Sequence, residues 1–436
     1  MKKMDIGVSL LCLSLVSASA FANPCTDHLD QYVSVDGTIL SLSNCSLNDK
    51  LLTDKVIPFL NAHPAINWLY MPYNNVDATG LQNLVINNST LTKLDVSFNK
   101  SVGAKGASYL AKKTNLIELS MWGDAVGVLG VLDLAASRSL QILDLGENNI
   151  GLKGIQGLAI NQTLQYLGLS ENNLNHNETA ALGNSKTLQT LDVSNNNLYA
   201  LDAANLAAIP SLTNLDISNN HLYDQGAKNL ATSHLQELYI SNNNLTFKGA
   251  DYIADITSLE TLDISSNSIK AEGIASIATL LTHLQWLDAD GDSITSAATL
   301  ANLLSLNFLD LDGNPLDSDT GVKLAKDRSL TNLYLAKTGL TDTSAYQFAT
   351  NDTLWQLDVS NNPGLSANAI TAMQSNPNFS LPDHWLWTNG DNASAISTRH
   401  VLPDVAKLRA NCINKHTTFC ENVIAVIKLE NQTTKS

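Results

Sequence analysis

Residues 187–199 read Thr-Leu-Gln-Thr-Leu-Asp-Val-Ser-Asn-Asn-Asn-Leu-Tyr, and the same pattern returns along most of the chain. Its apolar positions are Leu188, Leu191, Val193 and Leu198, and its fixed polar position is Asn196. The pattern recurs about every 24 residues until near residue 365. A period of this length is typical of a solenoid, in which each coil packs only on its neighbours. A chain of 436 residues can therefore fold without one large central core.

The positions equivalent to Asn196 define a column that we call the asparagine ladder. Counted from Cys45, which starts a first and irregular repeat, the pattern predicts fourteen coils. The ladder residues after Cys45 are Asn74, Asn99, Asp124, Asn148, Asn172, Asn196, Asn220, Asn243, Asn267, Asp292, Asn314, Thr338 and Asn362.

Each column has a physical reason. Leu191 and Val193 alternate with polar residues, which predicts a short strand whose apolar side chains point inward. Strands of successive coils pair in parallel about 4.8 Å apart, so these side chains form a continuous core. Asn196 and its equivalents can hydrogen-bond backbone groups in the following turn, which would otherwise be buried and unpaired. Asp124, Asp292 and Thr338 lack the amide donors, and we predict weak points there.

The other half of each coil reads as a short helix. In residues 226–231, Gly-Ala-x-x-Leu-Ala places its apolar side chains on one face, and residues 106–111, 249–254 and 273–278 repeat the pattern. Helices are wider than strands, so the coils should stack into a curve. We predict an α/β solenoid, shaped as a horseshoe with a parallel concave sheet and short convex helices, capped at both ends.

These motifs resemble leucine-rich-repeat proteins of the ribonuclease-inhibitor-like class. The 24-residue unit with Gly-Ala-x-x-Leu-Ala is similar to the GALA-type repeats of bacterial effectors, and the resemblance covers roughly residues 37–366. It implies a bacterial protein whose repeats are mainly a binding scaffold, with contact to host proteins as one role. GALA-type effectors also carry an F-box. No such helical segment precedes the repeats, so the resemblance does not extend to a ubiquitin-ligase adaptor.

The chain divides into four segments by composition. Residues 1–22 have a basic start, an apolar run and the cleavage signal Ala20-Phe21-Ala22, which predicts a secretory signal peptide and a periplasmic or secreted protein. Residues 23–62 are predicted to be an N-terminal cap that includes the first irregular repeat. The repeats occupy residues 63–366, and residues 367–436 are predicted to be a C-terminal cap.

Four cysteines follow the signal segment, one pair near each end. In an exported protein this placement predicts the disulfides Cys25–Cys45 and Cys412–Cys420. Free thiols or a metal site remain the alternative, although the sequence has no Cys-x-x-Cys spacing.

The net charge of −16 argues against nucleic acid and anionic lipid as main partners. It favours a cationic partner, although solubility alone would also explain it. No apolar run in the repeats or the C-terminal segment is long enough to span a membrane.

The residues beside the inward leucines should face the concave side, and eight of the fourteen at one position are Asp. We predict that this acidic and aromatic surface binds a basic protein, with the aromatic residues as anchors. The alternative is that Asp is merely a soluble choice at this position. The predicted partner-binding residues are Trp68, Tyr70, Asp95, Trp122, Asp144, Tyr166, Asp192, Asp216, Tyr239, Asp263, Trp286, Asp288, Phe308, Asp310, Tyr334 and Asp358.

Other kinds of site have weaker signals. Asp288, Asp290, Asp310 and Asp312 lie at equivalent positions of adjacent coils and are a weak candidate for Ca²⁺, which needs six or more oxygen ligands. No hydrolase, metalloprotease or phosphate-loop motif is present, and no cofactor is expected. We therefore predict a non-enzymatic, monomeric, exported protein-binding scaffold. The alternative is a carbohydrate-binding or hydrolytic protein that uses the Asp-rich face.

Overall fold

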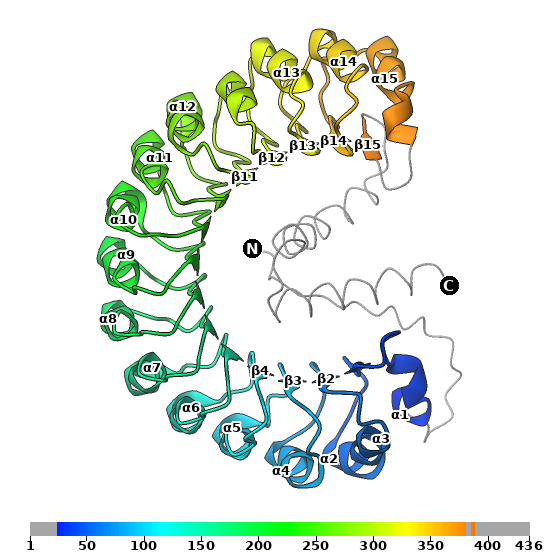
Figure 1. Cartoon of the computed structure of the whole chain (residues 1–436), viewed down its shortest axis with the longest axis vertical. Coiled ribbons are helices and arrows are strands. Elements are labelled where there is room, and N and C mark those ends of the chain that lie inside the picture. The colour runs from blue at the N-terminus through cyan, green and yellow to red at the C-terminus, as the bar shows by residue number, and fades with distance from the viewer. Residues whose placement is uncertain (1–23, 381–384, 389–436) are drawn as a thin grey trace. The chain divides into compact units, whose positions relative to one another are not determined.

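The computed structural model describes residues 24–380 and 385–388, which form two compact units that divide between Ile150 and Gly151. Both units repeat one coil of a three-residue strand, a turn and a short helix (Figure 1). The predicted signal peptide at residues 1–22 and the predicted Cys412–Cys420 disulfide lie outside the described residues. No helix in the described part is long and apolar enough to cross a membrane.

Unit 1 carries five parallel strands among its described residues, and in Figure 1 its helices lie on one side of them. The strands are β1 (Ile39–Ser41), β2 (Trp68–Tyr70), β3 (Lys93–Asp95), β4 (Glu118–Ser120) and β5 (Ile142–Asp144). The helices are α1 (Pro24–Asp27), the 3₁₀ helix η1 (Leu29–Tyr32), α2 (Asp49–Leu51), the π-helix η2 (Leu52–Val56), α3 (Ile57–Ala62), α4 (Ala78–Asn87), α5 (Gly103–Leu110) and α6 (Gly127–Ala135).

Unit 2 carries ten parallel strands in its described part, again with the helices on one side (Figure 1). The strands are β6 (Tyr166–Gly168), β7 (Thr190–Asp192), β8 (Asn214–Asp216), β9 (Glu237–Tyr239), β10 (Thr261–Asp263), β11 (Trp286–Asp288), β12 (Phe308–Asp310), β13 (Asn332–Tyr334), β14 (Gln356–Asp358) and β15 (Trp385–Trp387). The helices are α7 (Gly151–Ala159), α8 (His176–Leu182), α9 (Ala200–Ala207), α10 (Tyr223–Leu230), α11 (Phe247–Ala254), α12 (Lys270–Leu280), η3 (Ala298–Asn302), α13 (Ser318–Ala325), α14 (Asp342–Phe348), α15 (Ala367–Gln374) and η4 (Pro377–Ser380).

The predicted leucine-rich-repeat solenoid is thus confirmed in both units. The central residue of each strand from β1 to β14 is a leucine that is at most 1% exposed, as Leu191 and Leu215 illustrate. Strands pair without slippage, with Leu191 opposite Leu215 and Thr190 opposite Asn214. A one-residue slip would turn every leucine to the opposite face, so burial of this column fixes the register.

The asparagine ladder holds the turns, as the sequence predicts. Asn220 Nδ2 donates to the carbonyls of Val193, Ile217 and Ser218 at 3.2, 2.9 and 3.1 Å, and its Oδ1 accepts from Leu198 N at 3.0 Å. One side chain therefore joins two coils and leaves these backbone groups paired. Thr338 also occupies a ladder position and reproduces part of this hydrogen bonding, because its Oγ1 donates to Leu335 O at 2.7 Å.

Small residues let the helices approach one another. A Cβ added at Gly273 in α12 would lie 2.7 Å from the Cβ of Ala250 in α11, closer than real carbon atoms come. The Gly-Ala pattern is therefore a packing requirement of adjacent helices. The coil between Asp292 and Asn314 is shorter than its neighbours and carries the 3₁₀ helix η3 in place of an α-helix.

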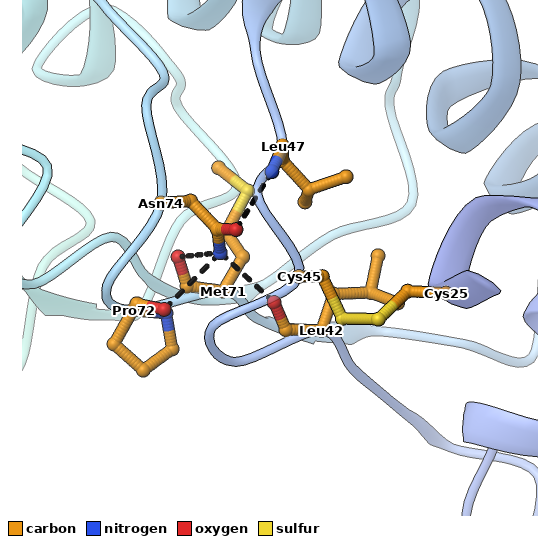
Figure 2. Close-up of a disulfide and its surroundings, with 7 residues drawn as sticks. All are labelled: Cys25, Leu42, Cys45, Leu47, Met71, Pro72 and Asn74. Carbon is orange, nitrogen blue, oxygen red and sulfur yellow. Dashed lines mark hydrogen bonds between the residues drawn. A yellow bond between two sulfur atoms is a disulfide. The ribbon is translucent and has the colours of Figure 1, made fainter. Parts of the chain in front are cut away.

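The N-terminal cap is joined to the first coil by the predicted disulfide. Cys25 in α1 is bonded to Cys45, in the turn after β1 (Figure 2). Asn74 lies beside them, accepting from Leu47 N at 2.8 Å and donating to Leu42 O at 2.8 Å. The first irregular repeat is thus linked covalently to α1 and through the asparagine ladder to the coil that follows it.

The described end of unit 2 differs from the sequence pattern. The repeat template stops near residue 366, yet Trp385–Trp387 form strand β15 and pair in parallel with β14, Trp387 lying opposite Asp358. A further strand therefore lies within the segment that the sequence predicts as a C-terminal cap.

Candidate functional site

The first and third residues of each strand point away from the helices, because side chains alternate along a strand. We call the surface that they form in each unit its sheet face. Fifteen of the sixteen predicted partner-binding residues occupy these two strand positions. Trp122 lies instead in the turn two residues after β4.

The sheet face of unit 1 begins with two buried aromatic residues. Trp68 and Tyr70 are 8% and 7% exposed and meet edge to face, with ring centroids 6.1 Å apart. Lys93 lies beside them, its Nζ 5.9 Å from the centre of the Trp68 ring and 3.7 Å from the Glu118 carboxylate. This lysine contacts an aromatic ring and a carboxylate together, the two groups that a basic side chain prefers as neighbours.

Two carboxylates follow on the same sheet face. Asp95 accepts from Ser97 N at 2.8 Å, and Asp144 accepts from Gly146 N at 3.0 Å. Burial raises the pKa of the Asp95 carboxyl to about 6, and burial together with the charge of Asp95 raises the pKa of the Asp144 carboxyl to about 6. Both groups therefore titrate close to neutral pH.

The sheet face of unit 2 carries carboxylates on neighbouring strands. Asp192 lies opposite Asp216, and Asp288 lies between Asp263 and Asp310. Like charges in register raise one another's pKa. Burial, and then Asp192, raise the pKa of Asp216 to about 7. Burial, and then Asp312 and Asp288, raise the pKa of Asp310 well above its ordinary value.

Each carboxylate in this column also has a structural role. Asp192 Oδ1 accepts from the backbone N of Ser194 at 2.8 Å, and Asp216 accepts from Ser218 N at 3.0 Å. This bond to the residue two positions later is an Asx turn, which stabilises the bend after the strand. The repeated Asp is therefore explained in part by the fold, and binding need not account for all of it.

The aromatic residues of unit 2 form a stack across neighbouring coils. The ring of Trp286 lies 4.8 Å from that of Phe308 at an interplanar angle of 15°, and Phe308 lies 5.4 Å from Tyr334. These three side chains are 3–4% exposed, and half-buried Trp387 packs against them. They are much more buried than solvent-facing anchors would be. Tyr239 continues the line, 6.4 Å from Trp286, and is half-buried.

The remaining predicted residues divide by exposure. Tyr70, Asp263 and Asp358 are buried, whereas Tyr166, Asp192 and the other sheet-face aspartates are half-buried. Among the predicted residues of unit 2, the accessible ones are therefore mainly carboxylates, beside half-buried Tyr166 and Tyr239, whereas the aromatic stack is buried.

The four-aspartate candidate for Ca²⁺ does not form a metal site in the structure. Among the described residues, no group of three or more His, Cys, Asp or Glu side chains is arranged to hold a metal ion. Their oxygens are directed to backbone donors, since Asp310 accepts from Asp312 N at 2.9 Å and Asp312 accepts from Ala336 N at 2.6 Å.

A shallow groove lies on the helix side of unit 2, between α7 and α8. It offers no acid, base or nucleophile for catalysis. Its lining residues are Leu152, Gln156, Ala159, Ile160, Asn177, Ala180, Ala181 and Asn184.

Sequence reasoning missed a second line of aromatic residues, in the turns after the strands of unit 1. Tyr73 and Phe98 stack with ring centroids 4.5 Å apart and planes 7° from parallel. The available signal was an aromatic residue directly before the ladder asparagine in two successive coils.

Comparisons with known proteins agree with this geometry. Three leucine-rich-repeat family patterns match residues 162–222, residues 87–111, 136–159 and 256–278, and residues 234–255. No curated protein sequence matches the chain.

Solved structures share the fold. An internalin, InlF from Listeria monocytogenes, aligns with a TM-score of 0.53 at 24% identity and covers 77% of this chain and 89% of its own. A structure of the yeast Rad7 and Elc1 complex aligns with a TM-score of 0.52 at 18% identity and covers 81% of this chain and 86% of its own.

Proposed function

Because the chain is a leucine-rich-repeat protein, we propose that it is a non-enzymatic scaffold that binds a basic protein partner on the sheet face of unit 2. The observation that supports this most is the run of half-buried carboxylates in register on that face, Asp192 with Asp216 and Asp288 with Asp310. A cationic partner would neutralise charges that otherwise repel one another. Similarity to a structure determined as a complex of two proteins, Rad7 with Elc1, is consistent with a protein as the partner.

Catalysis by the sheet-face carboxylates has less support. Asp192 and Asp216 each use an oxygen to hold their own turn, and their neighbours repeat along the sheet. A hydrolase needs two carboxylates with different roles at one place. A uniform column is better suited to attracting a long cationic surface. Carbohydrate binding remains the competing function that the experiments below distinguish.

The first test compares two isosteric double variants. Asp192→Asn with Asp216→Asn removes two sheet-face charges, while the amide oxygens still accept from Ser194 N and Ser218 N. Asp255→Asn with Asp319→Asn removes two exposed charges at the helices and is the matched control. The probe is a synthetic peptide of alternating Arg, Lys and Gly, with binding measured by calorimetry.

We expect the sheet-face variant to bind the peptide about tenfold more weakly, and the control to bind like the unmodified protein. The affinity should also fall as salt is raised, since the interaction is between charges. If the sheet-face variant and the control variant lose equal affinity for the peptide, the peptide responds to the net charge of the protein and not to the sheet face. Binding of oligosaccharides on a glycan array without peptide binding would refute the proposal.

The pH dependence gives an independent check. The raised pKa of Asp216, about 7, means that its charge appears as pH rises through neutrality. A cationic partner prefers the ionised form, so its affinity should increase between pH 5.5 and 7.5 and its binding should release protons. An affinity that is flat across this range would argue against these carboxylates as the contact.

We also propose that the protein is exported, to the periplasm or beyond the cell, and that a host protein is among its candidate partners. The basic and apolar start of the sequence and the Cys25–Cys45 disulfide support export, because disulfides persist in oxidising compartments. Cell fractionation tests this. A mature protein that begins near residue 23 outside the cytoplasm is expected, and an uncleaved cytoplasmic protein would refute it.

A further inference from the structure

The turns after β2 and β3 in unit 1 hold aromatic residues in an unfavourable backbone conformation. Tyr73 and Phe98 have φ of 57° and 60°, the left-handed region that bulky side chains rarely adopt. Equivalent positions of other coils also have positive φ but carry mainly glycine, asparagine or short polar residues. These include Gly123, Asn195, Asn219, Asn242, Ser266, Gly291, Gly313 and Asn361, while Glu147, Glu171 and Lys337 hold longer charged side chains there; Tyr73 and Phe98 are the aromatic residues of this set.

The two rings are supported by the coils that follow. Phe98 lies over Gly123, where an added Cβ would be 2.8 Å from Cδ1 of its ring, and Tyr73 stacks on Phe98. Trp122 lies in the same way over Gly146, where an added Cβ would be 2.6 Å from the indole. The glycines thus leave room for flat rings. We call the surface formed by Tyr73, Phe98 and Trp122 the aromatic turn surface.

This surface is accessible, unlike the aromatic stack of unit 2. Tyr73 is 46% exposed, and Phe98 and Trp122 are half-buried. A residue placed only to fill the core would be buried, and most other coils make this turn with Asn, Gly or Ser. Holding an exposed aromatic side chain at positive φ costs stability. Such strain is retained where the side chain itself is needed.

The charge around the aromatic turn surface determines what it can bind. Exposed Glu147 follows directly after Gly146, on which Trp122 lies, and Asp95 and Asp144 end the strands that lead into these turns. Flat rings next to carboxylates suit a guanidinium group, which is planar, stacks on aromatic faces and pairs with carboxylates. An ammonium group would use the charge but gain less from the flat surface.

We propose that the aromatic turn surface binds an arginine side chain of a basic protein partner. This inference rests on the proposed function for the kind of partner, but its aromatic residues lie outside the sheet face and it names the side chain. The guanidinium stacks on the exposed aromatic surface that includes Tyr73 and pairs with Asp95, the carboxylate that ends the strand leading into the turn of Phe98.

The test uses a variant that should fold at least as well as the unmodified protein. Tyr73→Asn with Phe98→Asn places at both positions the residue that other coils use at positive φ, so thermal unfolding should be unchanged or shifted upward. The probes are short acetylated, amidated peptides that contain arginine, lysine or citrulline at one position. Citrulline keeps the shape of arginine and removes its charge.

We expect the arginine peptide to bind and the citrulline peptide to bind at least tenfold more weakly, with lysine between them. The Tyr73→Asn, Phe98→Asn variant should lose at least tenfold in affinity for the arginine peptide. Equal binding of the arginine and citrulline peptides, or an unchanged affinity of the variant, would overturn the proposal. An oligosaccharide that binds the unmodified protein and not the variant would also overturn it, in favour of a sugar ligand.

The Asp192→Asn, Asp216→Asn variant separates this inference from the proposed function. If that variant weakens binding of the basic peptide and the aromatic variant does not, the aromatic inference fails and the proposed function stands. If neither variant changes the binding of basic peptides, both fail.

Discussion

Replacing Asp124 with asparagine should stabilise the protein, and the effect should depend on pH. Asp124 occupies a position of the asparagine ladder and is fully buried. Its Oδ1 accepts from Asn99 N at 2.6 Å, while its Oδ2 is buried without a hydrogen-bond partner. In the next coil the matching atom is the amide Nδ2 of Asn148, which donates to Met121 O and Gly146 O at 2.7 and 2.8 Å.

The magnitude follows from the proton that the carboxyl must keep. Burial, together with the charge of Asp95, raises the pKa of Asp124 from 3.8 to about 9. When folding raises the pKa of an acid, the contribution of that acid to the stability of the native state is greatest below its unfolded pKa. This contribution is lost as the pH rises towards the folded pKa. Each pH unit in this range lowers the free energy of unfolding by about 1.4 kcal/mol. The native state therefore loses about 4 kcal/mol of stability between pH 4 and pH 7.

Asparagine carries no such titration and supplies two amide hydrogens to carbonyls of the ladder. Each new hydrogen bond adds about 1 kcal/mol. We therefore expect Asp124→Asn to raise the free energy of unfolding by about 6 kcal/mol at pH 7, by less at pH 4.5 and by more at pH 8.5. Urea unfolding followed by circular dichroism at these three pH values measures this difference.

The control is Asp133→Asn, at an exposed position of α6 in the same unit, which should change stability by less than about 0.5 kcal/mol at every pH. If Asp124→Asn is no more stable than the unmodified protein, or if its advantage does not grow with pH, the carboxyl is not held neutral in the ladder and the reasoning is wrong.

Three further changes test other parts of the structure. Asn220→Ala removes three donated hydrogen bonds and one accepted bond, so chemical denaturation should show a loss of about 3 kcal/mol, and full stability would argue against the ladder. Cys25→Ser with Cys45→Ser opens the loop between residues 20 positions apart and should lower stability by about 3 kcal/mol, whereas an unchanged melting temperature without reductant would show that the cap needs no covalent link. Trp286→Ala removes a side chain that is 3% exposed and stacked on Phe308, so calorimetry should show a loss of about 3 kcal/mol in stability. An unaffected melting temperature would show that Trp286 is a surface residue and not part of the core.

The repeat coil could be predicted from the sequence because each column has one physical task. Leu191 fills the core, Asn196 pairs the turn, and Gly273 lets two helices meet, and each task permits few residue types. Strand β15 was not predicted, because no asparagine stands at the ladder spacing after Trp387, although Leu386 lies opposite Leu357 as the central leucine of a coil would.

The candidate surface was predicted only in part. Alternation places Trp286 on the sheet face, but its burial depends on the rings of Phe308 and Tyr334 from later coils. The Asx turns of the aspartate column depend on backbone geometry that the sequence pattern does not specify. The aromatic turn surface was missed because positive φ at Tyr73 becomes visible only in the structure.

Site-specific photo-crosslinking in the cells that make the protein tests the central claim most directly. A photoreactive residue is placed in turn at Thr190 and Asn214 on the sheet face of unit 2, and at Lys153 and Gln225 in the helices α7 and α10 of the same unit. We expect a protein adduct from the two sheet-face positions that disappears when an arginine-rich peptide competes, and no adduct from the helix positions. Adducts confined to the helix positions, or adducts that the peptide does not compete away, would contradict the central claim.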